Sequence, residues 1–206
     1  MGFTRAELEA FRDREVEDLV GSGLRLLFVG INPGLWTAAV RTHFAHPGNR
    51  FYPALAQAGI TGYEIDRVAG MSDADRAHLV GRGIGITNLV RRATARADEL
   101  SRAELVAGGE RLRRLVAEHR PAVVAVAGIT AYRDAFGERR AVAGRQPDTL
   151  DSAALWSGAA LWVVPNPSGL NAHETVETLA EAYAAPAAEA GVIAGRPTSR
   201  SHTLSE

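Results

Sequence analysis

Short runs of apolar residues alternate along the chain with longer stretches in which apolar positions recur every three or four residues. The apolar runs cover residues 26–29, 122–128 and 161–165, and a mixed stretch that is apolar at both ends covers residues 83–90. An unbroken apolar run of this length, closed by glycine, proline or asparagine, is typical of a strand buried on both faces of a parallel sheet. We therefore expect buried strands in these four places, with part of a loop included in 83–90.

The stretches between the strands carry helix signals. Capping boxes begin two of them, at Thr4 and Ser101, and N-cap residues begin two more, at Asn49 and Ser72. The expected helices cover residues 4–19, 50–58, 72–81 and 101–119, a short helix that ends near 136, and residues 174–188. The polar stretch 138–151 predicts a loop.

Strands that alternate with helices predict an α/β fold, here a three-layer α/β/α sandwich around a mostly parallel sheet. The chain has 206 residues, is 46% apolar and carries a formal charge of −1, which suits one domain with a full core. We expect that domain to cover residues 1–194, with helix 4–19 packed on it, and the tail 195–206 to be disordered. The apolar runs are too short to cross a membrane and the charged N-terminus is unlike a signal peptide, so a cytoplasmic location is expected.

Two of the predicted strands, the first and the last, each end in an Asn-Pro turn. The turns are Gly30-Ile31-Asn32-Pro33-Gly34 and Asn166-Pro167-Ser168-Gly169-Leu170. Proline holds the residue before it extended, so each asparagine projects just beyond its strand. Ligands bind at the edge formed by the carboxyl ends of parallel strands. Local turn preference explains either turn alone equally well, but the pair predicts a cleft in which Asn32 faces Asn166.

The residue types near this cleft limit its chemistry. Asparagine is not a strong base, but it can hold a water and stabilise charge, which suits a reaction driven by its leaving group. Phe44 offers a flat apolar face for a planar ligand, although burial in the core explains a phenylalanine equally well. We assign His43 and His46 to packing or surface roles.

Two residue types are absent from the sequence, cysteine and lysine. Without cysteine there are no disulfides, thiol nucleophiles or cysteine-ligated metal sites. Without lysine there is neither a Schiff base nor the lysine of a phosphate-binding P-loop. Histidines and carboxylates do not occur at metal-binding spacing, so we expect neither a metal nor a cofactor.

Five arginines, and no acidic residue, lie between positions 76 and 96. They are Arg76, Arg82, Arg91, Arg92 and Arg96. A local cluster of this kind can bind a phosphate backbone even in a nearly neutral protein. The alternative is a solvated face that is balanced by the acidic N-terminal helix.

Four segments resemble, in order, the mismatch-specific uracil-DNA and thymine-DNA glycosylases. They read GINPGL, HFAHPGNRFYPALAQAGIT, GITNLVRRAT and NPSGLNA, and the similarity extends from about residue 24 to residue 185. The resemblance implies the uracil-DNA glycosylase α/β/α sandwich, in agreement with the fold expected above. The sequence departs from the bacterial pattern at Trp36, at 40–42, at His173 and at Asn88, where some members have lysine. These departures leave open which bases are accepted.

The resemblance also implies roles for individual residues. Asn32 matches the catalytic asparagine that positions the attacking water, and Asn166 matches the asparagine of the second motif. The residues implied to bind the flipped base are Ile31, Phe44 and Asn88, with Phe44 stacking on it. The residues implied to contact or enter the duplex are Ser168, Gly169, Leu170 and Asn171, and we add Arg91 and Arg92 from the cluster.

The implied activity is that of a monofunctional DNA glycosylase in base excision repair. It would hydrolyse the N-glycosidic bond of uracil, and of thymine or modified pyrimidines, in G·U and G·T mismatches and leave an abasic site. Flipping a base out of the duplex costs a few kcal/mol, least at a mismatch. The absence of lysine excludes strand cleavage through a lysine imine. The expected partner is mismatched double-stranded DNA, bound by a monomer at the nucleoid of a bacterial-type cell.

Two alternatives to this activity remain. The first is a non-catalytic module of the same fold that binds mismatched or damaged DNA without cutting it. The second is an unrelated small-molecule hydrolase that acts on free nucleosides, against which the arginine cluster argues.

Overall fold

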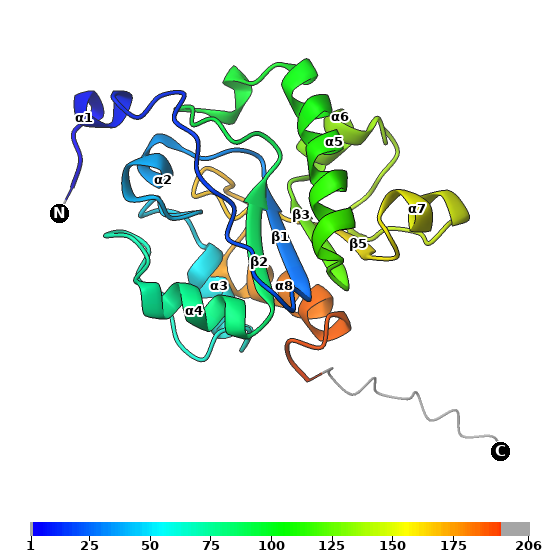
Figure 1. Cartoon of the computed structure of the whole chain (residues 1–206). Helices are drawn as coiled ribbons and strands as arrows, with labels where there is room; N and C mark the ends of the chain where they lie inside the picture. The colour runs from blue at the N-terminus through cyan, green and yellow to red at the C-terminus, as the bar shows by residue number, and fades with distance from the viewer. Residues whose placement is uncertain (1, 195–206) are drawn as a thin grey trace.

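A five-stranded sheet with helices on both faces forms the centre of the computed structural model, which describes residues 2–194 (Figure 1). The strands are β1 (Leu26–Gly30), β2 (Ile84–Asn88), β3 (Val123–Ala127), β4 (Gly144–Arg145) and β5 (Ala160–Val164). Their order in the sheet is β2-β1-β3-β5-β4. All neighbours are parallel except β4, which pairs antiparallel with β5. The expected α/β/α sandwich with a mostly parallel sheet is confirmed.

Each face of the sheet has its own helices and its own core. One face carries α3 (Phe51–Gln57), α4 (Asp73–Gly81) and α8 (Val176–Glu189), and the other carries α5 (Arg102–His119) and α6 (Ile129–Phe136) (Figure 1). Strand β1 serves both cores, because Leu26 and Phe28 pack on the first side while Leu27 and Val29 pack on the second. Side chains alternate along a strand. A strand covered on both faces must therefore be apolar throughout, which is why the apolar runs identified these strands.

Helices α3, α4 and α5 begin where the sequence predicts. The Ser101 hydroxyl accepts the backbone N–H of Glu104 at 3.2 Å, and the Glu104 carboxylate accepts the N–H of Ser101 at 2.8 Å. Ser72 begins α4 with the same reciprocal bonds. At α3 the Asn49 side chain accepts the N–H of Phe51 at 2.9 Å. Each side chain satisfies a backbone donor that has no partner within the helix, so these starts are set locally.

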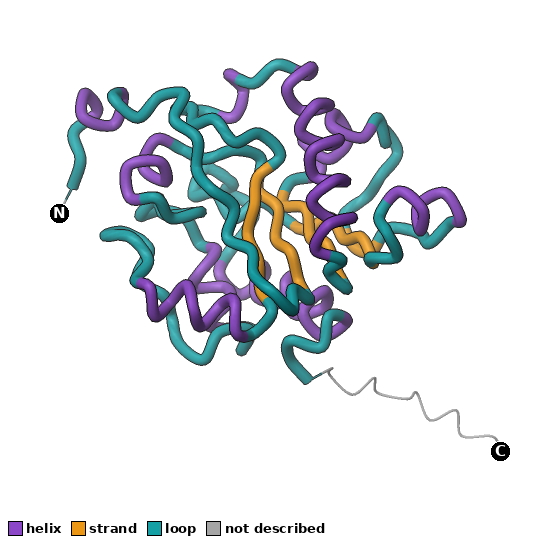
Figure 2. Tube along the Cα trace, in the orientation of Figure 1, coloured by secondary structure: helices purple, strands orange, loops and turns teal. Residues whose placement is uncertain are grey.

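The helix expected over residues 4–19 is wrong beyond its first turn. Helix α1 covers only Arg5–Glu9, and Asp13 has a φ of 62°, which a right-handed helix does not allow. The segment that follows runs beside β2 as an extended loop (Figure 2), where Leu19 exchanges two backbone hydrogen bonds with Ile86, each 2.8 Å long. The outer edge of β2 offers unpaired backbone groups. Pairing with that edge outweighs the helix preference of this charged segment.

Several short elements are not predicted by the sequence pattern. Helix α2 (Leu35–Val40) follows the first Asn-Pro turn, and a 3₁₀ turn covers Ala97–Glu99. The loop expected over 138–151 contains β4 and the start of α7 (Leu150–Leu155). Elements of two to six residues are too short to show a period, so tertiary contacts decide whether they form.

The predicted disorder of the tail 195–206 falls outside the described residues. Among residues 2–194, the helices are all too short or too polar to cross a lipid bilayer.

Candidate active site

The carboxyl ends of β1, β2 and β5 bring three asparagines to one edge of the sheet. Asn88 is the last residue of β2, while Asn32 and Asn166 follow β1 and β5 by two residues. All three line one pocket of about 510 Å³, as the paired turns predicted for Asn32 and Asn166. The other lining residues are Ile31, Pro33, Gly34, Thr37, Phe44, His46, Gly48, Asn49, Thr94, Ala95, Arg96, Ala97, Ser168, Gly169 and Leu170.

The amide of Asn32 is held in one orientation. Its Nδ2 donates to Thr94 Oγ1 at 2.7 Å and lies 3.1 and 3.2 Å from the carbonyl oxygens of Pro33 and Arg92. The Thr94 hydroxyl donates its own proton to the carbonyl oxygen of Arg96 at 2.7 Å. It can therefore only accept a hydrogen bond from Asn32. Three acceptors therefore face the nitrogen. The Oδ1 atom accepts no hydrogen bond from the described residues and is available to hold a water.

Asn166 is held the other way round. Its Oδ1 accepts the backbone N–H of Ser168 at 3.0 Å, which leaves Nδ2 as the free group. Its carbonyl accepts Asn171 Nδ2 at 3.1 Å, and Asn171 N donates to the carbonyl of Ser168 at 2.9 Å. The loop 166–171 is therefore closed by its own amides. At its tip the Leu170 side chain is 91% exposed.

Arg50 fixes this loop to the opposite rim of the pocket. Its guanidinium donates to the carbonyl oxygens of Asn171 and Glu174 at 3.0 and 2.8 Å, and to that of Gly169 at 3.3 Å. Gly169 lies so close that a Cβ there would be 2.6 Å from the carbonyl oxygen of Gly48. The exposed Leu170 is thus presented by an anchored loop.

Phe44 both packs on the core and lines the pocket. Its ring stacks on Phe51, with centroids 4.2 Å apart and an interplanar angle of 29°, while the half-buried side chain also lines the pocket. Its φ of 55° is unusual for a large side chain. A Cβ on Gly30 would lie 3.1 Å from the Phe44 ring and 2.3 Å from Asn88 Oδ1, so only glycine fits under these two groups.

Asn88 is 4% exposed, and the side chains of His43 and Arg111 form hydrogen bonds with it. Its Nδ2 lies 3.0 Å from His43 Nδ1, and His43 Nε2 lies 2.9 Å from the carbonyl oxygen of Glu17. The Arg111 guanidinium donates to the Asn88 carbonyl oxygen and pairs with Asp18 at 2.8 Å. Burial lowers the pKa of His43 to about 4, so this histidine is neutral at pH 7. The extended N-terminal segment therefore reaches the back of the pocket.

Arg96 is the charged residue among the described residues that line this pocket, and it pairs with Asp98 at 2.5 Å. Aspartate and glutamate do not occur among those lining residues. Since the part of the pocket that the structure describes holds no carboxylate, its chemistry depends on amides and backbone groups, as the sequence indicated.

Arg91 and Arg92 do not line the pocket. Arg92 forms ion pairs with Glu104 at 2.6 Å and with Asp13 at 2.9 Å, and Arg91 pairs with Glu15 at 3.4 Å. Their charges are thus balanced by acidic residues, mainly of the N-terminal segment, which is the alternative that the sequence left open. Arg92 contributes to the site through its main chain, whose carbonyl accepts from Asn32.

Thr94, His43 and Arg50 are site residues that sequence reasoning did not assign. Thr94 lies within the segment GITNLVRRAT, but nothing in the sequence shows that it meets Asn32, which is 62 positions away. His43 is buried as a packing role requires, but its contacts with Glu17 and Asn88, 26 and 45 positions away, leave no signal in the sequence. Arg50 directly follows the pocket-lining residue Asn49 in the sequence. The carbonyl groups to which it donates belong to a loop about 120 residues later.

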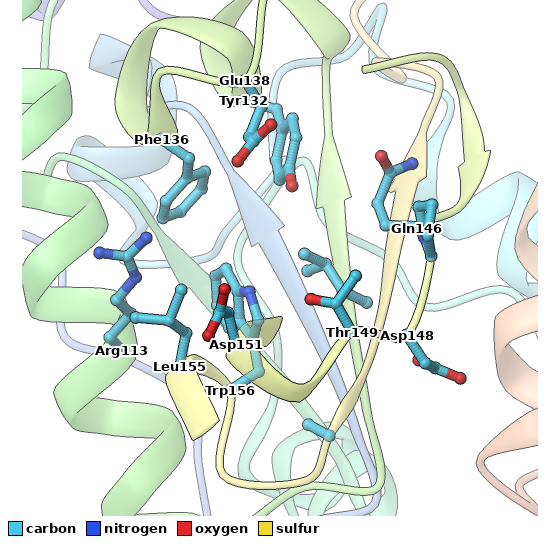
Figure 3. A pocket seen from close by; sticks show the side chains of 13 residues that line it. Arg113, Tyr132, Phe136, Glu138, Gln146, Asp148, Thr149, Asp151, Leu155 and Trp156 are labelled. Atoms are coloured by element: carbon cyan, nitrogen blue, oxygen red, sulfur yellow. The ribbon is translucent and has the colours of Figure 1, made fainter. Parts of the chain in front are cut away.

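A second cavity, of about 310 Å³, lies between α5, α6 and α7 (Figure 3). The guanidinium of Arg113 lies over the rings of Phe136 and Trp156 there, 5.3 and 5.9 Å from their centroids. None of the three asparagines lines it. Residues 2–194 contain no group of three or more histidine, aspartate or glutamate side chains that could hold a metal ion.

Comparisons with known proteins identify the family of the chain. The sequence profile of the Uracil DNA glycosylase superfamily matches residues 18–186, most of the chain. Among solved structures, the fold is similar to the solution NMR structure of a candidate uracil DNA glycosylase from Methanosarcina acetivorans. That match has a TM-score of 0.58 and 16% sequence identity, and it covers 87% of this chain and 98% of the other. The profile match spans both Asn-Pro turns and every strand, and the chain therefore belongs to the uracil DNA glycosylase superfamily.

Proposed function

We propose that this protein is a monofunctional DNA glycosylase that removes uracil from G·U mismatches in double-stranded DNA, and also acts on thymine or modified pyrimidines in G·T-type mismatches. The observation that carries the proposal is the pair of asparagines with opposite free groups, Asn32 and Asn166, in one pocket beside the Phe44 ring. Membership of the superfamily supports it.

Asn32 would position the attacking water. Its Oδ1 is the free acceptor of a locked amide, so it can hold a water by one proton and direct the oxygen toward the C1′ atom of a flipped nucleotide. An amide does not remove the proton as a strong base would. The reaction therefore depends on how well the base leaves, and we expect slow turnover and a preference for bases with good leaving ability.

The rest of the pocket would hold the flipped base and stabilise it as it departs. Phe44 offers one ring face to the base, since the other is covered by Phe51. Asn88 offers its side-chain amide to the base. Ile31 and Phe44, whose backbone groups would bond the edge of the base, line the same pocket. Hydrogen-bond donors directed at the base oxygens would stabilise the developing anion.

Leu170 would fill the space that the flipped nucleotide leaves. It is apolar, exposed and carried by a loop that Arg50 anchors. Apolar side chains that enter a base stack in this way offset part of the cost of unstacking.

The test uses duplexes that differ only at one central pair, G·U, G·T or A·U, followed by alkaline cleavage of abasic sites. With enzyme in excess we expect strand breaks at G·U, fewer at G·T and fewest at A·U. Asn32→Ala should lower the single-turnover rate by about 100-fold or more, because the attacking water is no longer held in position, with DNA affinity retained.

Two results would contradict the proposal. Mismatch-selective binding without any abasic product would instead identify a non-catalytic DNA-binding module. An Asn32→Ala rate equal to that of the wild type would remove Asn32 from its assigned role.

A further inference from the structure

His43 lies directly behind the pocket and connects it to the N-terminal segment. The residue is 3% exposed and lies between the carbonyl of Glu17 and the side chain of Asn88. Neither Glu17 nor Asn88 positions the attacking water in the proposed reaction. The histidine is therefore a buried titratable group that the proposed mechanism leaves unused.

The chemistry of its two partners fixes the direction of both hydrogen bonds. A backbone carbonyl only accepts, so His43 Nε2 must carry the proton that is donated to Glu17. In a neutral imidazole the other nitrogen, Nδ1, then has a lone pair and only accepts. The atom of Asn88 that faces Nδ1 at 3.0 Å must be the amide nitrogen, and the amide oxygen must point the other way.

The amide oxygen of Asn88 lies on the side of Gly30 and the Phe44 ring, and both Asn88 and Phe44 line the pocket. Its distance from the position of a Cβ on Gly30 is 2.3 Å, and that position is 3.1 Å from the Phe44 ring. Among the described residues Oδ1 accepts no hydrogen bond, although Asn88 is almost fully buried. The oxygen is not among the fully buried side-chain atoms that lack a hydrogen-bond partner, so it is accessible from the pocket that Asn88 lines, where a ligand can supply a donor.

We propose that His43 is a specificity-determining positioning residue, which through its Nε2–H tautomer turns the amide of Asn88 so that the pocket presents a fixed acceptor to the base. This inference rests on the proposed function. The matching chemical class is a pyrimidine with an imide N3–H, such as uracil. Cytosine has a lone pair at N3 and would place it against the lone pairs of Asn88 Oδ1.

The charges around His43 agree with this tautomer. Burial is the largest influence and lowers the pKa of His43, Arg76 and Arg111 lower it further, and Asp18 and the Glu17 carbonyl raise it. Burial prevails, so a proton does not occupy Nδ1 at neutral pH. With a proton there, the Asn88 amide would have to turn and present its NH₂ group to the base.

A double-mutant cycle on the G·U duplex tests the link between the two side chains. We expect His43→Leu and Asn88→Ala each to lower the single-turnover rate by about tenfold, the size expected when one buried hydrogen bond is lost. The double variant should be no slower than Asn88→Ala alone, because His43 acts through Asn88. His43→Gln offers an amide N–H and a carbonyl oxygen in place of the two ring nitrogens, and should recover most of the rate.

A second measurement does not depend on catalysis. In ¹⁵N-histidine NMR spectra of the wild-type protein at pH 7, we expect His43 to be the neutral Nε2–H tautomer. In the spectra of Asn88→Ala its Nδ1 signal should shift toward that of an imidazole nitrogen without a hydrogen bond. This measurement needs only the wild-type protein and Asn88→Ala, so it remains possible if His43→Leu does not fold.

The outcomes separate the inference from the proposed function. A wild-type protein that releases no uracil contradicts the function, and the NMR spectra then decide the inference alone. A proton on Nδ1 of His43, or losses that multiply in the double variant of an active enzyme, would overturn the inference.

Discussion

Asn32, Asn88 and Asn166 line the pocket with the same side chain, yet their neighbours decide whether the oxygen or the nitrogen of each amide is free. Three acceptors hold the nitrogen of Asn32, a backbone N–H holds the oxygen of Asn166, and a histidine lone pair holds the nitrogen of Asn88. Asn32 and Asn88 are left as acceptors and Asn166 as a donor. At the scale of single residues, the polarity of the site is therefore decided by the groups behind the asparagines.

Thr94→Val tests how far the orientation of Asn32 depends on its strongest partner. The change removes the acceptor at 2.7 Å but keeps the shape of the buried side chain. We expect the single-turnover rate on G·U duplexes to fall by about three- to tenfold, since the carbonyls of Pro33 and Arg92 remain. Thr61→Val is the matched control, because the buried Thr61 hydroxyl has no hydrogen-bond partner among the described residues. Equal rates for both variants would contradict the role of Thr94.

Gly30→Ala tests whether Asn88 and Phe44 need a residue without a side chain beside them. The added methyl group would lie 2.3 Å from Asn88 Oδ1 and 3.1 Å from the Phe44 ring. We expect excision to fall by at least tenfold and the stability to fall by about 1–3 kcal/mol, because inserting a methyl group into a packed site forces its neighbours apart. In the control Gly81→Ala the added atom meets nothing within 4 Å, so activity should be unchanged. Thermal unfolding and single-turnover assays check both, and a fully active Gly30→Ala protein would contradict the packing argument.

At the scale of elements, the strand-to-helix loops carry the site and the N-terminal segment completes it. The loop after β5 is anchored by Arg50, and the segment that pairs with β2 supplies Glu17 and Asp18 behind the pocket. The caps that begin α4 and α5 are local, so the sequence predicted both helix starts, with a capping box at Ser101 and an N-cap at Ser72. The first segment also has such a box, at Thr4, but there the edge of β2 competes with the helix and prevails after one turn.

Leu170→Ala tests the anchored loop as a wedge. The side chain is 91% exposed, so its truncation should leave the melting temperature unchanged. We expect excision from a G·U duplex to fall by about tenfold, because the variant lacks the group that fills the emptied stack, while excision from single-stranded DNA changes little. Leu150→Ala on α7 is the matched control at 93% exposure. Equal losses on both substrates would instead indicate a role in binding the base.

At the scale of the whole molecule, burial of His43 couples its neutral state to folding. The pKa of His43 falls from an ordinary value of 6.5 to about 4 in the folded protein, mainly through burial and against the opposing charge of Asp18. Above pH 6.5 both the folded and unfolded chains are neutral at this residue. As the pH falls from 6.5 toward 4, the unfolded chain takes up a proton that the folded chain does not, so the folded state loses stability.

The loss approaches about 3 kcal/mol at pH 4, since one pKa unit corresponds to about 1.4 kcal/mol. Denaturant unfolding of the wild type between pH 7 and 4 should show this loss, and His43→Gln should show a much weaker pH dependence over the same range. His119→Gln, at the end of α5, should keep the wild-type dependence. A wild-type free energy of unfolding that does not change over this range would contradict the burial argument.

The sequence by itself determined the four parallel strands, most of the long helices, the sandwich and the edge at which the site lies. These follow from signals that neighbouring residues carry together, such as an apolar run, a capping box or an Asn-Pro turn. Only the tertiary structure decided which atoms the asparagines present, because their partners lie far away in sequence. It also decided the course of the N-terminal segment, where pairing with the edge of β2 outweighs a local helix preference.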